Sequence, residues 1–229
     1  MKSFIFASLV CFFALTFASA QEVSRTFNVS GFTKLDLGSA FKIDVKQGSN
    51  YQVIVTGKAN DLDDLEYGVT RSTLRIGYKN NGWRKSRENV RVSITMPSLD
   101  GVDFSGASTA SVRGFEGGSM SVAVSGASRV EMNFSAKNVE LDLSGASRVM
   151  FIGQATSLEG EISGASEFNG KQFPAQKVNL NASGASSASV IANSSLQVDA
   201  SGASRISYAG KVRDVRSSTS GAGSVRRAN

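Results

Sequence analysis

The sequence predicts an all-β fold, a right-handed parallel β-helix with coils of about 19 residues. The phrase Ser-Gly-Ala-Ser recurs along the second half of the chain, beginning at Ser105, Ser125, Ser144, Ser163, Ser183 and Ser201, with a variant, Ser-Gly-Ala-Gly, at Ser220. Subtracting successive starts gives spacings of 20, 19, 19, 20, 18 and 19 residues. Apolar and polar residues alternate on both sides of each phrase, as in half-buried strands. Glycine, serine and β-branched residues within the repeats disfavour a helix.

Each repeat supplies one strand leading into the phrase and another leading out of it. In one example, residues 141–143 (Leu-Asp-Leu) precede the phrase and residues 148–151 (Arg-Val-Met-Phe) follow it. Equivalent positions recur in the same chain direction, so successive coils should stack as parallel strands. Crossovers between parallel strands are almost always right-handed.

The phrase itself is expected to form one repeated corner of the solenoid. Glycine readily adopts the positive φ that a sharp corner needs, and alanine and serine are small enough to stack over their copies. A phosphate-binding loop would need a helix start with Lys or Thr, and a nucleophilic serine would need an activating base. We therefore assign a structural role at this corner to six glycines: Gly106, Gly126, Gly145, Gly164, Gly184 and Gly202.

Residues 1–20 read as a signal peptide. Lys2 supplies the positive start, residues 4–17 form an apolar run, and residues 18–20 (Ala-Ser-Ala) form a cleavage site. The alternative, a retained membrane anchor, is disfavoured because the run is short for a spanning helix. Cleavage predicts an exported protein that starts at Gln21, located in the periplasm, at the cell surface or outside the cell. The rest of the chain has no comparable apolar run, so no transmembrane segment is expected after signal removal.

Residues 21–100 form a less regular N-terminal β region in this interpretation, and residues 101–229 form the regular β-helix. The first region lacks the repeat phrase but keeps strand-like alternation, for example at Phe41, Ile43 and Val45. Residues 37–40 (Leu-Gly-Ser-Ala) resemble a worn copy of the phrase. The region is either a set of irregular coils continuing the solenoid or a small sandwich that caps it, since an uncovered end exposes strand edges and core.

The composition argues against most catalytic chemistry. The sequence has no histidine, and its single cysteine, Cys11, lies in the predicted signal peptide. The commonest general base, zinc ligation and thiol chemistry are therefore absent from the mature chain. We assign no catalytic residue, no cofactor and no metal. Removing Lys2 leaves 24 basic and 19 acidic residues, a net charge of +5 (24 − 19), which gives only a mild pull toward anionic surfaces.

Two rows of side chains at fixed offsets from the phrase are the candidate binding surface. Two positions before the phrase stand Asp103, Ala123, Asp142, Glu161, Asn181 and Asp199; four positions after it stand Thr109, Arg129, Arg148, Glu167, Ser187 and Arg205. In-register coils would align each row on the outside. We select Arg129, Arg148, Arg205, Asp142 and Glu161 as candidate surface contacts for a sugar polymer. Calcium would need more oxygen ligands than the neighbouring carboxylates Asp142 and Glu161 supply. The alternative is a solvated face whose charges balance across coils.

A loop adds a sixth candidate contact, Trp83, which stands beside Arg84 and Lys85. An aromatic side chain among basic ones can bind sugars or nucleic acid. Because an exported β-rich protein seldom meets nucleic acid, we expect no nucleic-acid partner.

Five features of the sequence resemble those of a bacterial family. They are the repeated phrase, Leu-Asp-Leu at 35–37, Val-Lys-Gln-Gly at 45–48, the junction Ile-Thr-Met-Pro-Ser-Leu at 94–99 and Tyr-Ala-Gly at 208–210. This family is the putative auto-transporter adhesin, head GIN domain. The resemblance runs from about residue 27 to residue 226. It implies a secreted or surface β-helical protein with no established activity, and it offers no catalytic residue to transfer.

Together these features predict a non-enzymatic surface or envelope protein that binds an extracellular or envelope glycan or protein through the solenoid face. The alternative is a polysaccharide lyase or hydrolase, whose active site would lie around Asp142, Glu161 and Arg148. A cleft holding two carboxylates about 5–10 Å apart would favour the enzyme, and a flat face would favour binding. The oligomeric state is open.

Overall fold

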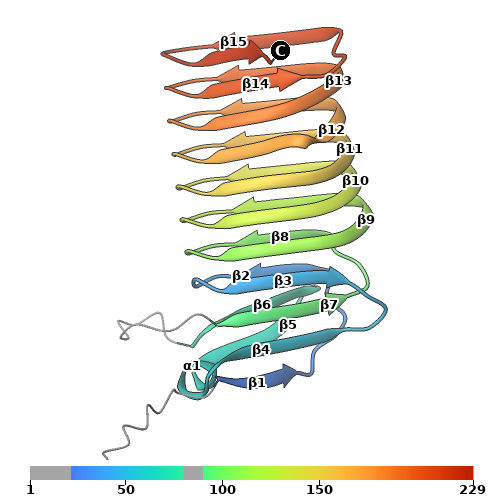
Figure 1. Ribbon diagram of the computed structural model, residues 1–229, viewed down its shortest axis with the longest axis vertical. Helices are drawn as coiled ribbons and strands as arrows, with labels where there is room; N and C mark the ends of the chain where they lie inside the picture. The colour runs from blue at the N-terminus through green and yellow to red at the C-terminus, as the bar shows by residue number, and fades with distance from the viewer. Residues whose placement is uncertain (1–21, 80–89, 229) are drawn as a thin grey trace, which may run out of the picture.

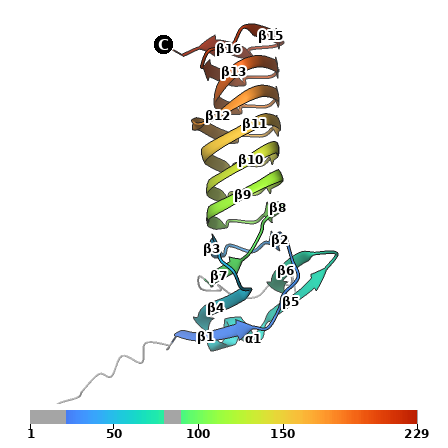
Figure 2. The ribbon, with the colours of Figure 1, turned by 90° about the vertical axis from the view of Figure 1, so that its right-hand side faces the viewer.

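The computed structural model describes residues 22–79 and 90–228. Flat coils stack into a tall column, with a less regular assembly at the N-terminal end (Figure 1). The column is a β-solenoid of about seven turns, which confirms the predicted all-β, parallel β-helical fold. Each coil is broad in one view and narrow after a 90° turn (Figure 2), so the solenoid is flattened, with two wide faces.

Five long strands build the regular part of the column. They are β9 (Thr109–Val124), β10 (Arg129–Leu143), β11 (Arg148–Ile162), β12 (Glu167–Ala182) and β13 (Ser187–Ala200), and each pairs in parallel with the next. Each strand runs from one repeat phrase to the following one and bends midway, so that its halves belong to opposite faces. The column is completed by β8 (Gly101–Phe104), β14 (Arg205–Ala209), β15 (Asp214–Thr219) and β16 (Ser224–Arg227).

The repeat phrases form the corner between one long strand and the next. The six corner glycines have φ between 66° and 78°, in the left-handed region that glycine tolerates. From the second phrase onward, the alanine of each phrase donates its backbone N–H to the glycine carbonyl of the preceding phrase, at 2.7–2.8 Å, as in the pair Ala146 to Gly126. A side chain on the glycine would collide with that carbonyl. For Gly145, an added Cβ would press on the carbonyl oxygen of Gly126.

The last serine of each phrase is buried beneath the corner. These residues, at most 2% exposed, are Ser108, Ser128, Ser147, Ser166, Ser186 and Ser204. Each hydroxyl donates to a backbone carbonyl at 2.9–3.4 Å. A buried hydroxyl without a partner would destabilise the fold, so these bonds explain why serine is tolerated there.

The bend opposite the corner absorbs the variation in coil length. In the coil that starts at Ser105, 20 residues long, Gly114 (φ 88°) bulges between Arg113 and Phe115, which pair with consecutive residues of β10. The shifts in strand register in the next irregular coils also lie in the bend. They fall between residues 169 and 177 in the coil that starts at Ser163, and between residues 189 and 195 in the coil that starts at Ser183. The corner and both faces therefore keep their register.

The interior is a continuous apolar column. Alternate residues of each strand point inward, as Val130, Met132 and Phe134 do in β10. Phenylalanine rings of different coils contact one another. The ring centroids of Phe134 and Phe173 lie 5.0 Å apart, and those of Phe151 and Phe168 lie 5.1 Å apart. Edge-to-face and tilted contacts of this kind add to the hydrophobic stabilisation.

The strands of the N-terminal region that lie next to the regular coils continue the parallel pairing of the solenoid. Strands β2 (Lys34–Leu37) and β3 (Lys42–Gln47) pair in parallel with β8 and β9. The register sets Gly38 opposite Ser105, so the worn corner is residues 38–41, one residue later than the sequence suggested. Ser39 takes the place of the corner glycine with φ of 79°, and Ala40 follows at 54°.

Antiparallel strands then close this end. Strands β6 (Thr73–Tyr78) and β7 (Arg91–Met96) pair in parallel with β2 and β3, whereas β4 (Gln52–Lys58) lies antiparallel to β7 and β1 (Glu22–Phe27) antiparallel to β4. Strand β5 (Leu65–Thr70) forms a hairpin with β6, and α1 (Ala59–Asp63) links β4 to β5. The region thus both continues and ends the column.

The corner yields a stability prediction. Gly145→Val should lower the free energy of unfolding by about 3 kcal/mol, because a β-branched residue would be strained at φ of 74° and would collide with Gly126. Gly118→Val is the matched control, since its φ is not positive and nothing lies within 4 Å of an added Cβ. Urea denaturation of both variants is the measurement. Equal stability of the two variants would contradict the role given to the corner.

Candidate binding surfaces

The two wide faces of the column carry different side chains. The face that follows the corner, called here the basic face, consists of outward residues of β3, β7, β14, β16 and the first halves of the long strands. Its charged residues are Lys42, Lys46, Arg91, Arg113, Arg129, Arg148, Arg205 and Arg226, against Asp44, Glu131 and Glu167. Eight positive charges less three negative ones leave +5 on this face.

The face that precedes the corner, called here the acidic face, has the opposite sign. It consists of outward residues of β2, β6, β8, β15 and the second halves of the long strands. Its charged residues are Asp36, Asp103, Glu140, Asp142, Glu159, Glu161, Asp199 and Asp214, against Lys34, Arg75, Lys177 and Arg216. Four positive charges less eight negative ones leave −4.

The three predicted arginines lie on the basic face, in one row across the strands. Arg129 is the register partner of Arg148, and Arg205 lies three strands further along the same row. Arg148 pairs with Glu167, its neighbour in the row, at 3.3 Å between Nε and Oε2. Both side chains are more than half exposed, so this pair contributes little to stability. Arg129 and Arg205 form no ion pair with the residues described.

The row is longer than the sequence indicated. Lys42 pairs in register with Thr109, and Arg91 pairs with Lys42, which extends the row toward the N-terminal end. Lys42 stands four positions after Gly38, as Arg129 does after Ser125. Aligning the worn corner one residue later would have revealed it.

The predicted carboxylates Asp142 and Glu161 are register partners on the acidic face. They line a shallow depression of about 340 Å³ together with Asn181, Asp199 and several serines. Glu140 and Glu159, two residues earlier, are also register partners, which completes a block of four adjacent carboxylates. Their shared offset, four positions before the phrase, is a signal that sequence inspection could have found. Among residues 22–79 and 90–228, no group of three or more carboxylates is arranged to hold a metal ion.

Asp103 lies at the N-terminal end of the same row, between Asp36 and Ala123. Burial is the main cause that raises the pKa of its carboxyl above the ordinary 3.8. The negative charges of Asp36 and Asp142 raise the pKa of Asp103 further, and Arg75 opposes them. Arg75 is held 2.7 Å from Asp36, between Nε and Oδ2, so its charge is shared by two carboxylates.

The structure does not bring all the candidates together. Arg148 lies on the basic face, whereas Asp142 and Glu161 lie on the acidic face on the far side of the corner. The three residues proposed as a lyase or hydrolase seat are therefore split between two faces. Trp83 lies outside the described residues.

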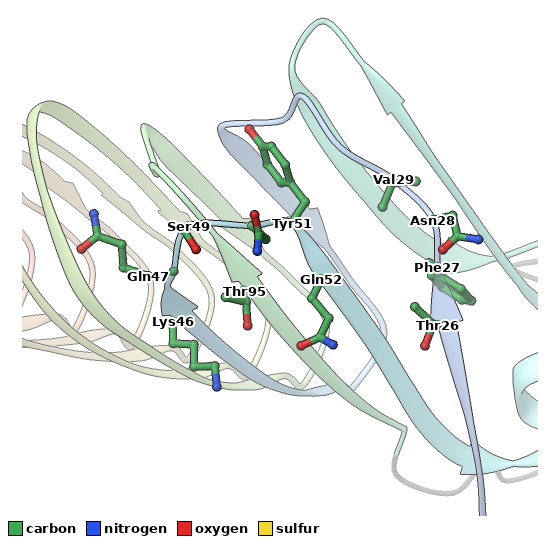
Figure 3. A pocket seen from close by; sticks show the side chains of 12 residues that line it. Thr26, Phe27, Asn28, Val29, Lys46, Gln47, Ser49, Tyr51, Gln52 and Thr95 are labelled. Carbon is green, nitrogen blue, oxygen red and sulfur yellow. The ribbon is translucent and has the colours of Figure 1, made fainter.

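A further hollow, which the sequence did not indicate, lies beside the N-terminal strands (Figure 3). Its volume is about 580 Å³, and its lining includes the amides of Asn28, Asn50 and Gln52 together with Tyr51 and Lys46. Gln47 also lines the hollow, and its Nε2 donates to the carbonyl of Pro97 at 3.1 Å. Figure 3 shows Gln52, Thr95 and Lys46 on three adjacent strands at one side of this hollow.

A flattened β-solenoid with long exposed faces belongs to the class of repeat proteins that present extended surfaces to their partners. This chain belongs to the putative auto-transporter adhesin, head GIN domain family, whose model matches residues 31–212. That finding confirms the family resemblance seen in the sequence. None of the curated proteins compared with the chain matches it.

Solved structures share the fold at low sequence identity. A putative adhesin from Bacteroides fragilis superposes with a TM-score of 0.87 at 20% identity, over 92% of this chain and 98% of its own. A putative adhesin from Parabacteroides distasonis gives 0.72 at 17% identity, and a putative lipid binding protein from the same species gives 0.68 at 18%, each with the same coverage. No helix among the described residues is both long and apolar enough to cross a bilayer.

The raised pKa of Asp103 gives a pH-dependent prediction. The folded state holds the Asp103 proton more tightly than the unfolded state does, so this group stabilises the fold below pH 3.8 and loses that effect as pH rises through the folded pKa. Asp103→Asn should therefore match the parent melting temperature at pH 3 and exceed it modestly at pH 7. Thermal denaturation at pH 3, 5 and 7 measures the difference. A variant less stable than the parent at pH 7 would show that attraction to Arg75 outweighs burial.

Proposed function

We propose that this chain is an exported, non-enzymatic protein of the cell surface or envelope that binds a glycan or protein through the basic face of its solenoid. The main observation behind this proposal is the in-register row of mainly basic side chains from Arg91 to Arg205, which lies on a flat face open to solvent. The row crosses seven strand spacings, from β7 to β14, which is about 34 Å at 4.8 Å each. A row of this length suits an extended partner such as a polymer chain.

The shape and chemistry of the face support binding rather than turnover. Glycoside cleavage by paired carboxylates needs them around one cleft, and lyase chemistry needs a base beside a carboxylate-bound metal. Asp142 and Glu161 instead lie in a shallow depression, and Arg148 lies on the other face. The adhesin names of the family and of two of the similar structures accord with this proposal.

Export is the part of the proposal that depends on residues 1–20, which lie outside the described residues. The expected product is a mature chain beginning at Gln21 in the envelope or culture medium of the producing bacterium. N-terminal sequencing of the protein from fractionated cells is the measurement. Recovery of the chain from the cytoplasm with residues 1–20 intact would contradict export.

Binding is tested with the mature chain on arrays of neutral and anionic glycans and of extracellular-matrix proteins. The triple variant Arg129→Ala/Arg148→Ala/Arg205→Ala should weaken binding at least tenfold, because the row loses three charges while all three sites remain exposed. The matched control is Lys137→Ala/Lys171→Ala/Lys211→Ala, which removes three exposed charges from the bend instead. The circular dichroism spectrum of each variant should match that of the parent.

Two outcomes would contradict the proposal. Binding that survives in the triple variant would exclude the arginine row as the contact surface. Release of unsaturated or shortened sugar products from any bound glycan would show that the protein is an enzyme.

A further inference from the structure

The two wide faces carry opposite charges that are mostly unpaired. On the acidic face, six carboxylates form no ion pair with any described residue: Asp103, Glu140, Asp142, Glu159, Glu161 and Asp199. On the basic face, the same is true of six cations: Lys42, Lys46, Arg91, Arg129, Arg205 and Arg226. Like charges stack directly over one another on each face, as Glu140 does on Glu159 and Lys42 on Arg91. Each face therefore favours an oppositely charged surface.

We propose that the acidic face of one copy of this chain docks on the basic face of a second copy. This inference goes beyond the proposed function, which concerns a foreign glycan or protein. The proposed contact is a sheet-on-sheet contact between two flat, regular surfaces. Its attraction comes from the charges, because the outward residues of both faces are mainly polar.

The two faces match in spacing and extent. Strands repeat at about 4.8 Å in both, so successive charges on the two copies are equally spaced. The unpaired cations run from β7 to β16, about 38 Å, and the unpaired carboxylates from β8 to β13, about 24 Å, at that spacing. With strand halves about 20 Å long, the shared patch is on the order of 500 Å² per copy, or about 1,000 Å² in total. That area is typical of a weak, reversible interface.

The symmetry of the contact follows from the fold. The acidic and basic faces point to opposite sides of the flattened column, so the contact joins unlike surfaces of two identical molecules. Such a heterologous contact leaves one free face at each end of the pair. The chain should therefore assemble into open stacks that lengthen with concentration, rather than into closed dimers alone.

A second copy fits this geometry better than a simple polyelectrolyte does. A polyanion would be attracted to the basic face alone and repelled by the acidic one, and a polycation would show the reverse preference. Only a partner with both kinds of face engages both. The same repeat spacing in both surfaces is guaranteed when the partner is another copy.

Sedimentation velocity of the mature chain at about 200 µM is the first experiment. The average mass should exceed that of the monomer in 20 mM NaCl and should fall to the monomer in 1 M NaCl, where the Debye length is about 3 Å. Exposed, charge-driven contacts are lost when salt screens them. A monomer at both salt concentrations would overturn the inference.

Two complementary variants locate the contact. The basic-face variant Lys42→Gln/Arg129→Gln/Arg205→Gln keeps a normal acidic face, and the acidic-face variant Glu140→Gln/Asp142→Asn/Glu159→Gln/Glu161→Gln keeps a normal basic face. Each variant alone should be monomeric in 20 mM NaCl. An equimolar mixture should form a 1:1 dimer that grows no further, because each partner then has one functional face. The control Lys137→Gln/Lys171→Gln should assemble as the parent does.

Other results would contradict the inference. If either variant still associates alone, or if the mixture stays monomeric while the parent associates, the contact lies elsewhere on the molecule. The glycan and protein binding screen of the proposed function can be repeated under two conditions in which the chain does not self-associate. The first is the parent chain in 1 M NaCl with the non-ionic ligands, and the second is the monomeric acidic-face variant in 20 mM NaCl. Binding there without assembly of the parent would overturn this inference alone, and assembly without binding would overturn the foreign-ligand proposal alone.

Discussion

The architecture depends on one short hydrogen bond that links each repeat phrase to the next. From the second phrase onward, the alanine N–H of each phrase donates to the glycine carbonyl of the phrase before it, at 2.7–2.8 Å, and the glycine brings the two backbones this close because it has no side chain. The bond fixes each coil against its predecessor at a single point. Because side-chain orientation alternates along a strand, a slip of one residue there would turn every inward residue outward. The corner thus sets the register of both faces and of the core.

That register explains the charge pattern of the surface. The bend absorbs extra residues such as Gly114, so residues counted forward or backward from a phrase always meet their equivalents in the next coil. A preference for acidic residues at one offset and basic residues at another therefore becomes a charged row instead of a scattered distribution. Repulsion within a row is tolerated because the side chains are exposed and water and salt screen them.

Much of the repeat region could be predicted from the sequence, because the spacing of the repeat phrase determines which residues of successive coils lie side by side. The phrase identified the corner, and its offsets correctly paired Asp142 with Glu161 and Arg129 with Arg148. The N-terminal end was less predictable. Antiparallel pairing of β1 with β4 depends on contacts between distant segments, and the β5–β6 hairpin turns at Arg71 and Ser72, both with positive φ, without the usual asparagine or glycine. The worn corner was misaligned because Ser39 takes the glycine conformation there.

The way the coils are joined also bears on how such a protein changes in evolution. Each coil meets its neighbours through the same corner bond, the same buried serine and similar inward side chains, so a segment of about 19 residues is an interchangeable unit. Duplicating or deleting one unit would leave the N-terminal strands and the final coil in their original surroundings. The column could become taller or shorter in single steps, and the reach of its charged faces would change with it while their width stayed constant.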